Sequence, residues 1–319
     1  MALSVPALRP RILGPPVLGE ALRSRQGPDG GTIGPRPVRG PSGKKIGGRT
    51  MKESLLSVPG ARLRHTVRGE GPLLLLIAGG HHGVEACEPL ARHLADRYTV
   101  VTYDRRGLSG STTDAPAKTI ATHAEDVAHL LRALTPEPVR IYGTSLGALI
   151  ALELTAGHPE QVATVIAHEP PVTGLLPEPE QAIGQLLTVE NTFRAKGADA
   201  AMRGFAAGLD IDPQDREPDA PVRAPGPDHL RNAEVLLTHD LPAIRAHVLD
   251  TAALKGTSAR IVAAAGETSG HVWPHTCAAA LADALGVGLE TFPGGHNGYV
   301  LRPRGTADRI HAVLATHTS

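Results

Sequence analysis

One pentapeptide in this 319-residue sequence carries the clearest chemical signal. Gly143-Thr144-Ser145-Leu146-Gly147 has the form G-x-S-x-G, and it lies between a β-type run at 139–142 and a helical run at 146–156. A nucleophilic serine on a strand-to-helix turn needs glycine neighbours, because the strained backbone leaves no room for side chains. The helix that follows also points its N-terminus at the reacting centre, where it favours negative charge. The pattern predicts that Ser145 is a nucleophile.

A serine hydroxyl needs a base, and a late histidine is placed to act as one. His296 lies in the glycine-rich segment Gly294-Gly295-His296-Asn297-Gly298, directly after the last expected strand at 287–292. It is the one histidine of 16 in that position. An imidazole beside the serine would accept its proton as acyl transfer begins. We therefore expect His296 to be the base.

An oxyanion that forms on the substrate needs two backbone N–H donors. The amide of Leu146 follows the serine directly, and a second donor is expected in the glycine loop after the strand Leu73–Ile77. We choose Gly80 in that loop, because a residue without a side chain lets the substrate approach closely. His81 and His82 follow, but no third ligand has metal-like spacing, so we interpret them as loop or rim residues and expect no metal.

Short β-type runs alternate with longer helical runs, which predicts an α/β fold with a mostly parallel sheet flanked by helices. The expected strands are 61–68, 73–77, 98–103, 139–142, 162–167, 260–265 and 287–292. The expected helices include 85–97, 146–156, 275–285 and 306–316, and Thr122 with Glu125 predicts a capping box for one more. Alternation lapses over 171–255, which we interpret as an inserted helical cap, so the core would comprise 51–170 and 256–319.

These motifs, taken in order, resemble those of the α/β-hydrolase superfamily. The similarity covers 51–319, and it is carried by four segments: Leu73-Leu74-Leu75-Leu76-Ile77-Ala78-Gly79-Gly80, Tyr103-Asp104-Arg105-Arg106-Gly107-Leu108-Ser109-Gly110-Ser111, the Ser145 turn, and Pro293-Gly294-Gly295-His296. The resemblance implies a serine hydrolase with an acid between serine and histidine in chain order. Two positions depart from the family pattern: Ala78-Gly79 replaces the usual His-Gly, and Ser269 stands where the acid usually lies.

Two glutamates remain as candidates for the acid. Glu169 directly follows the expected strand 162–167, a position from which some superfamily members, including haloalkane dehalogenases, take their acid. Glu267 is the rival, near the more common location. We prefer Glu169, because the Pro170-Pro171 pair after it fixes the local backbone and would help to hold a carboxylate in place. The choice stays open at the level of sequence.

The formal net charge of zero is the sum of two unlike regions. Residues 1–50 hold nine basic and two acidic residues, a net charge of +7, so the other 269 residues carry −7. The first 50 residues also lack hydrophobic periodicity and are rich in Gly and Pro, which predicts disorder. Met51 is a candidate translation start, since Gly47-Gly48 can be encoded by a sequence that resembles a bacterial ribosome-binding site.

The composition bears on partners and location. An acidic body gives no support to nucleic-acid binding, and the longest apolar run is too short to cross a bilayer. With two cysteines and no secretory signal, a cytoplasmic protein is expected. The glycine loop near Gly83 departs from the dinucleotide-binding register, so we expect no cofactor. The oligomeric state is open.

The expected function is hydrolysis of a small or medium apolar ester, lactone or thioester through an acyl-enzyme. The cap over 171–255 is rich in Leu, Ala and Ile, and its aromatic residues are Phe193 and Phe205, which suggests an adaptable apolar pocket. Two alternatives are a cofactor-free perhydrolase or haloperoxidase-like enzyme and a non-catalytic ligand-binding member of the fold.

Overall fold

A computed structural model describes residues 43–46, 49–222 and 224–316, all within one structural unit, Pro41–Ser319. Its ten strands form one sheet in the order β1-β2-β3-β5-β4-β7-β8-β9-β10, with β6 paired to β3. The strands are β1 (Gly43–Ile46), β2 (Arg49–Val58), β3 (Ala61–Arg68), β4 (Leu73–Ile77), β5 (Thr99–Tyr103), β6 (Thr112–Thr113), β7 (Val139–Thr144), β8 (Val162–His168), β9 (Arg260–Gly266) and β10 (Leu289–Phe292).

The sheet is parallel from β5 through β10, and antiparallel pairing is confined to the pairs that involve β1, β2, β3 and β6. β4 is an unbroken apolar run, as expected for a strand covered on both faces. The mostly parallel α/β sheet predicted from the sequence is therefore confirmed. Because parallel neighbours end at the same edge, the loops after β4, β7, β8, β9 and β10 meet there.

The beginning of the sheet differs from the expectation that residues 1–50 are disordered. β1 and the first residues of β2 precede Met51 and pair with each other, and β2 pairs with β3 from Lys52 onward. The alternation in β2 was missed because charged and polar residues such as Lys52 and Glu53 interrupt its apolar positions. The rest of the expectation, for 1–42 and 47–48, lies outside the described residues.

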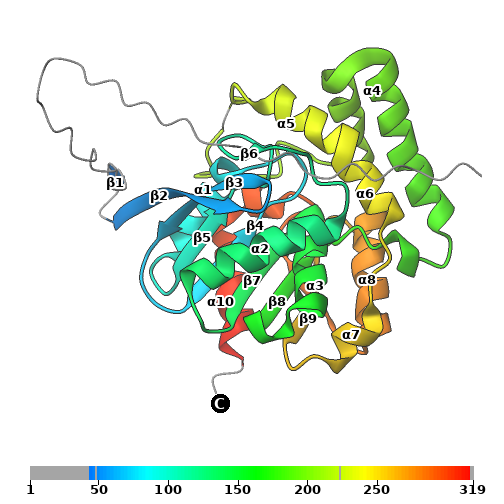
Figure 1. Ribbon diagram of the computed structural model, residues 1–319. Helices are drawn as coiled ribbons and strands as arrows, with labels where there is room; N and C mark the ends of the chain where they lie inside the picture. The colour runs from blue at the N-terminus through cyan, green and yellow to red at the C-terminus, as the bar shows by residue number, and fades with distance from the viewer. Residues whose placement is uncertain (1–42, 47–48, 223, 317–319) are drawn as a thin grey trace, which may run out of the picture. The chain divides into compact units, whose positions relative to one another are not determined.

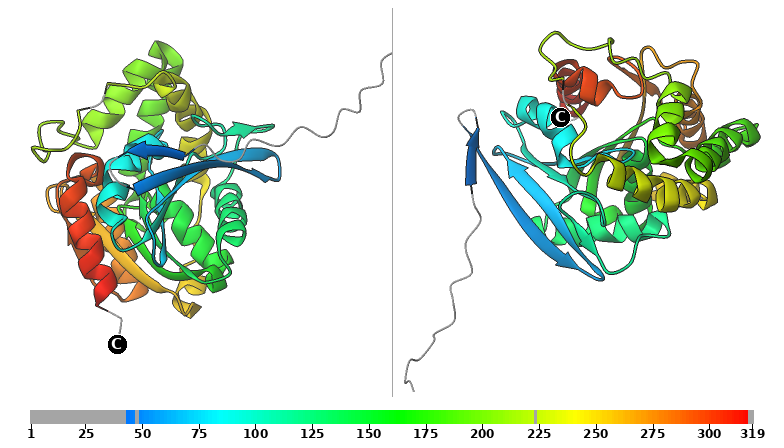
Figure 2. Two further views of the ribbon diagram at one scale, coloured as in Figure 1. Left: turned by 90° about the vertical axis from the view of Figure 1, so that its left-hand side faces the viewer. Right: turned by 90° about the horizontal axis from the view of Figure 1, so that it is seen from above.

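Helices cover both faces of the sheet (Figure 1). Two groups of buried residues fill the space between helices and sheet. The larger involves α2 (Ile120–Leu134), α3 (Leu146–Gly157) and α8 (Trp273–Leu285); the smaller involves α1 (Val84–Leu94) and α10 (Pro303–Ala315). Seen from above in Figure 2, α3 and α10 lie on opposite sides of the sheet. α3 is buried along most of its length, which fixes its N-terminus at the end of β7.

Between β8 and β9 the chain forms a group of helices, of which the first members lie above the sheet in Figure 1 and the last lies near the lower end of the molecule. Its members are η2 (Thr173–Leu175), α4 (Pro179–Gly208), α5 (His229–Val235), the π-helical turn η3 (Leu236–Asp240), α6 (Leu241–Ala246) and α7 (Thr251–Gly256). α4 kinks at Gly197, whose φ of 83° suits glycine. α7 contacts α3 and α8 of the core, so the last part of the insertion, before residue 255, already packs against the core.

One local prediction was wrong. The N-cap of α2 is Thr119, whose hydroxyl accepts a hydrogen bond from the amide of Thr122 at 3.2 Å. Glu125 instead contacts His158, at 2.8 Å. The helix therefore starts at Ile120, and the spacing of Thr122 and Glu125 imitated a capping box one turn too late.

Within residues 49–222 and 224–316, no helix combines the length and the apolar character that a bilayer crossing requires. Two short elements remain: the 3-10 turn η1 (Pro159–Gln161), between α3 and β8, and the helix α9 (Gly298–Leu301), which follows His296.

Candidate active site

Ser145 lies on a strained turn between β7 and α3. Its φ of 52° and ψ of −126° fall outside the regions that ordinary residues occupy. The flanking glycines are required sterically: a Cβ on Gly143 would lie 2.5 Å from the Gly147 carbonyl oxygen, and one on Gly147 would lie 2.1 Å from that of Ile77. The Ser145 amide donates to the His168 carbonyl at 2.8 Å, which ties the turn to β8. The backbone thus holds the hydroxyl-bearing residue at the sheet edge.

The loop after β4 packs directly on this turn. A Cβ on Gly79 would lie 2.8 Å from the Ser145 Cβ, so a side chain is excluded there. Gly80 has a φ of 53°, and a Cβ on it would meet no atom within 4 Å, because it faces the open pocket. Among the described residues, neither the Gly80 amide nor the Leu146 amide donates a hydrogen bond to another protein group. Both amides are therefore free to donate to a ligand.

His296 and Glu169 are in direct contact. The Nδ1 of His296 lies 2.6 Å from the Oε2 of Glu169, and both side chains are buried. Glu169 follows the last residue of β8 and has a φ of 48°, a conformation that costs free energy for a residue with a side chain. Its amide donates to the Ala264 carbonyl at 2.9 Å, which fixes it against β9. The imidazole is thereby oriented through one nitrogen, and the other stays available.

The other oxygen of Glu169 receives two donors from the end of β9. The Gly266 amide donates to Oε1 at 2.8 Å, and the Ser269 hydroxyl donates to the same atom. His275 lies close by, with its Nδ1 3.3 Å from the Ser269 Oγ. Ser269 stands where the family usually has its acid, so here that position donates a hydrogen bond to the carboxylate. The sequence had singled out Ser269 without assigning it this role.

The pKa of Glu169 is held well below its ordinary value. Burial by itself would raise this pKa, but the hydrogen bond from His296, the nearby His168 and the hydroxyl of Ser269 lower it more strongly. Glu169 is therefore ionised at neutral pH, although it is fully enclosed.

Glu267, the rival acid, is not brought to His296. Its side chain is exposed, and its amide donates to the Phe292 carbonyl at 2.8 Å. Only one residue separates it from Ser269, yet the turn after β9 directs the Ser269 side chain into the protein and the Glu267 side chain to the surface. Sequence distance could not distinguish these two directions.

A pocket of about 270 Å³ contains Ser145, His296 and Gly80 in its lining. Its apolar wall comes from α4 and the turn that follows: Met202, Phe205, Ala206, Leu209 and Ile211. The other aromatic residue expected in the cap lining, Phe193, packs against the buried core instead. The pocket therefore opens between the sheet edge and the helices that precede β9.

Imidazoles form much of the opposite wall. The Nε2 of His81 lies 3.1 Å from the Nδ1 of His229, and the Nδ1 of His82 lies 2.6 Å from the Tyr299 hydroxyl. Burial, together with neighbouring positive groups, lowers the pKa of His81 to about 2 and that of His82 to about 4. Both rings are therefore neutral at physiological pH and provide polar but uncharged contacts. They line the pocket, in agreement with their interpretation as rim residues.

Two residues that follow β5 support the loops around the pocket. Asp104 is fully buried and accepts hydrogen bonds from the amides of Val84 and Gly110, at 2.8 and 3.0 Å. Arg105 is almost fully buried and contacts the carbonyl oxygens of Ala78 and Gly80. Sequence reasoning had no signal for this contact of Arg105, because its partners are backbone atoms distant in the chain.

Comparison with known proteins agrees with this architecture. The family description "alpha/beta hydrolase fold" matches residues 72–205. The uncharacterized hydrolase YraK of Bacillus subtilis (strain 168) is 34% identical over 273 residues, which cover 83% of this chain and 97% of that protein.

Two solved structures share the fold at low identity. A thermophilic esterase from Thermogutta terrifontis, with malate bound, has a TM-score of 0.64 at 18% identity, over 84% of this chain and 98% of its own. The naproxen esterase of Bacillus subtilis has a TM-score of 0.63 at 16% identity, over 84% and 92%. With a sheet of this order, a strained turn after β7 and a relative that matches nearly from end to end, the chain belongs to the alpha/beta-hydrolase family.

Proposed function

We propose that this hydrolase is a serine hydrolase that cleaves small or medium apolar esters, lactones or thioesters through an acyl-enzyme. Ser145 is the nucleophile, His296 the base and Glu169 the acid, while the amides of Gly80 and Leu146 form the oxyanion hole. One observation carries the proposal: a serine on a strained turn shares a pocket with a histidine whose Nδ1 lies 2.6 Å from a buried carboxylate. That is the set of groups that nucleophilic acyl transfer needs.

The reaction would proceed in two steps, acylation of Ser145 and hydrolysis of the acyl-enzyme. In the first, His296 Nε2 takes the proton of the Ser145 hydroxyl while Oγ bonds to the substrate carbonyl carbon, and the carbonyl oxygen becomes an oxyanion. The oxyanion then collapses, the bond to the leaving group breaks, and the leaving group takes the proton from His296. In the second half, water gives a proton to His296 and attacks the acyl-enzyme. The acid product leaves and Ser145 regains its proton.

The supporting groups suit the charges that develop. The Glu169 carboxylate stabilises the imidazolium that forms in each half, and it holds the tautomer with the proton on Nδ1. The Gly80 and Leu146 amides have no other protein acceptor among the described residues, so they can donate to the oxyanion. The N-terminus of α3, which begins at Leu146, adds a positive partial charge beside the oxyanion.

The pocket suggests which substrates fit. Most of its wall on the α4 side is apolar, and the charged residues on that side, Asp199 and Arg203, form an exposed ion pair with each other. The opposite imidazoles of His81 and His82 are uncharged. A neutral acyl compound with a short or medium chain would bury its apolar part against Met202 and Phe205. Charged acyl groups would lose hydration without a buried partner of opposite sign in the apolar wall.

Initial rates of hydrolysis of p-nitrophenyl acetate, butyrate and dodecanoate by wild type and Ser145→Ala test the proposal. We expect wild type to prefer butyrate or acetate over dodecanoate, and we expect the alanine variant to lose at least about 1,000-fold in kcat. Circular dichroism would verify that the variant is folded. Hydrolysis by Ser145→Ala at the wild-type rate would refute the nucleophile assignment.

A further inference from the structure

The loop that carries Gly80 is held through hydrogen bonds to three successive carbonyl oxygens, those of Ala78, Gly79 and Gly80. Arg105 donates through Nη1 to the Ala78 oxygen at 3.3 Å and through Nη2 to the Gly80 oxygen at 2.6 Å. Between them, the Gly79 oxygen accepts from the His82 amide at 3.2 Å. The Gly79 oxygen and the Gly80 N–H belong to one planar peptide group, so fixing the oxygen also fixes the direction of the N–H. Each of these three carbonyls is therefore occupied, whereas the amide of Gly80, which lines the pocket, has no acceptor among the described residues.

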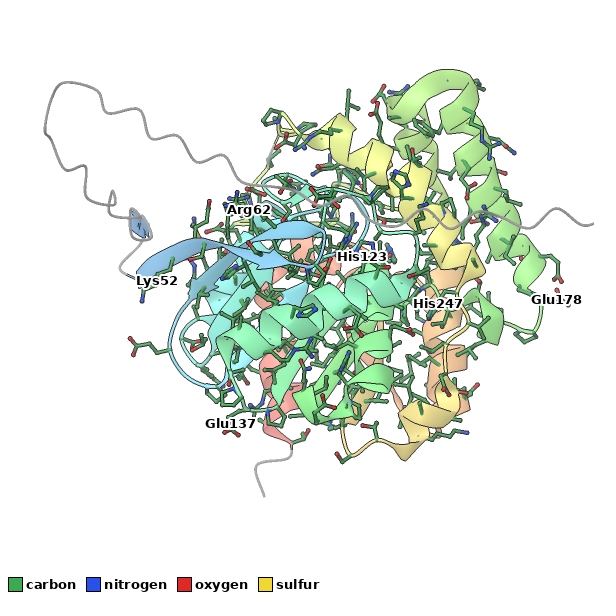
Figure 3. The ribbon with its side chains drawn as sticks, viewed as in Figure 1. Lys52, Arg62, His123, Glu137, Glu178 and His247 are labelled. Atoms are coloured by element: carbon green, nitrogen blue, oxygen red, sulfur yellow. The ribbon has the colours of Figure 1, made fainter. Side chains whose placement is uncertain are left out.

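Arg105 is itself held from the helices between β8 and β9. Its Nη2 lies 2.8 Å from the Oδ2 of Asp240, the last residue of η3, and both side chains are almost fully buried. The other oxygen of Asp240 lies 3.1 Å from the Nε2 of His123. His123 belongs to α2, and Figure 3 shows it near the end of that helix that faces the cap helices. One guanidinium thus joins the loop after β4, the helices above the pocket and α2.

The charge states of this cluster are consistent with a permanent ion pair. Burial by itself would raise the pKa of Asp240, but Arg105 and His123 lower it below its ordinary value. Arginine also suits the position better than lysine would. Its planar fork can reach several acceptors at fixed angles, whereas an ammonium group on a flexible stem is a point charge.

We propose that Arg105 is a positioning residue for the oxyanion hole and that Asp240 holds Arg105 in the orientation this task needs. The inference rests on the proposed function, because it concerns the stabilisation of the oxyanion that Ser145 would create. Arg105 does not touch the substrate: it fixes the loop whose Gly80 amide does. Asp240 belongs to the helices between β8 and β9. The oxyanion hole would therefore be aligned only when these helices are packed in place.

The expected effect is on the chemical step more than on binding. A displacement of about 1 Å in a reacting group costs about 100-fold in rate, and loss of one oxyanion donor costs about 100- to 1,000-fold. In Arg105→Lys the loop keeps a positive charge nearby but loses the double carbonyl contact. We therefore expect kcat for p-nitrophenyl butyrate to fall about 10- to 100-fold, with KM within about threefold of wild type.

A readout specific to the oxyanion hole separates positioning from general damage. Sulfur is a weak hydrogen-bond acceptor, so an enzyme with an aligned oxyanion hole favours an oxo ester over the matching thiono ester. The test is the ratio of kcat/KM for p-nitrophenyl butyrate to that for its thiono analogue. We expect this ratio to fall about tenfold or more in Arg105→Lys. A loss of folded protein would lower both rates equally and leave the ratio unchanged.

Arg106 provides a matched control. It is also buried, forms an ion pair with Asp126 and donates to a carbonyl oxygen, that of Pro59, which lies outside the loop. Arg106→Lys should lower stability yet keep the ratio within about twofold of wild type, because no oxyanion donor depends on it.

A second variant keeps the test decisive if Arg105→Lys does not fold. Asp240→Asn preserves the shape of the side chain and removes the charge that orients Arg105, so the ratio should fall in the same direction, by about threefold or more. Suppose that wild type hydrolyses the ester through Ser145 and that folded Asp240→Asn has the same oxo-to-thiono ratio as wild type. That result would overturn this inference and leave the proposed function standing. Absence of Ser145-dependent hydrolysis in wild type would overturn the proposed function and this inference with it.

Discussion

The neighbouring parallel strands β8 and β9 both end close to His296, and a glutamate follows each of them, but the two glutamates have different surroundings. Glu169, after β8, is fully buried and accepts hydrogen bonds from His296, Ser269 and the Gly266 amide. Glu267, after β9, is exposed. The end of β9 thus supplies donors to a carboxylate from β8. Proximity in sequence to the histidine loop does not predict which glutamate contacts His296, because the direction of each side chain at a strand end decides it.

The largest expected effect on kcat comes from a pair of matched variants at the two glutamates. Glu169→Gln keeps the volume of the side chain and removes its charge, so the imidazolium loses its counter-ion and the tautomer of His296 is no longer fixed. By analogy with triad aspartates, we expect kcat to fall about 1,000- to 10,000-fold. Glu267→Gln should stay within about twofold of wild type, as a surface substitution does. Steady-state rates with p-nitrophenyl butyrate measure both, and equal losses in the two variants would remove the distinction between the strand ends.

A double variant asks whether the two strand ends can exchange roles. Ser269 occupies the position at which the family usually has its acid, and its hydroxyl already reaches the Glu169 carboxylate. We expect Glu169→Gln combined with Ser269→Asp to recover about 10- to 100-fold of the kcat lost in Glu169→Gln alone, because a carboxylate again faces His296. Recovery below twofold in a folded double variant would mean that the end of β9 can hold only a donor.

Removal of the donor alone gives a smaller effect. Ser269→Ala leaves Glu169 with the Gly266 amide and His296 as hydrogen-bond partners, and with the Nδ1 of His275 3.8 Å from its Oε1. Hydrogen bonds to charged groups contribute about 1.5–3 kcal/mol, so kcat should fall about tenfold as the carboxylate loses its fixed orientation. Ser269→Thr retains a hydroxyl and should restore most of the rate. If Ser269→Ala were as active as wild type, the hydroxyl would have no part in orienting the acid.

The smallest effect concerns stability in acid. The pKa of Glu169 is well below the ordinary value of 4.5 in the folded protein, so the folded state keeps its charge while the unfolded state takes up a proton as pH falls. The stabilisation is present above about pH 5 and is lost as pH falls toward the folded pKa. The free energy of unfolding of wild type should therefore fall more steeply than that of Glu169→Gln, by up to about 1.4 kcal/mol per pH unit.

Urea unfolding of the two proteins at pH 7, 5 and 4 measures this difference. Parallel curves for wild type and Glu169→Gln over that range would show that the carboxylate titrates normally in the folded protein. Glu267→Gln is the control here too, and its curve should follow that of wild type.

The sequence was sufficient for those parts of the fold that depend on periodicity. The strands at Ala61–Arg68 and Leu73–Ile77 have the expected bounds, and the turn after β7 lies where G-x-S-x-G predicts it. Strand β2 was missed because its polar residues hide the alternation, and the N-cap of α2 was misplaced because several nearby threonines can cap. These local features depend on pairing and backbone geometry that sequence spacing does not record.

For the candidate site, residue types could be predicted, and partners could not. Ser145 and His296 were predicted from their places in the order of strands, and both line the same pocket. The choice between Glu169 and Glu267 depended on side-chain direction, and the contacts of Arg105 depended on carbonyl oxygens more than 20 residues away. Such long-range contacts are set by packing of the whole sheet.

The central claim, that Ser145 is a nucleophile activated by His296 and Glu169, has a direct test. Wild-type protein is treated with a fluorophosphonate and the modified peptide is identified by mass spectrometry, with the rate of modification measured in wild type and Glu169→Gln. Our account predicts modification of Ser145 alone, at a rate at least about 100-fold slower in Glu169→Gln. Modification of another residue, or no modification of folded wild type, would contradict it.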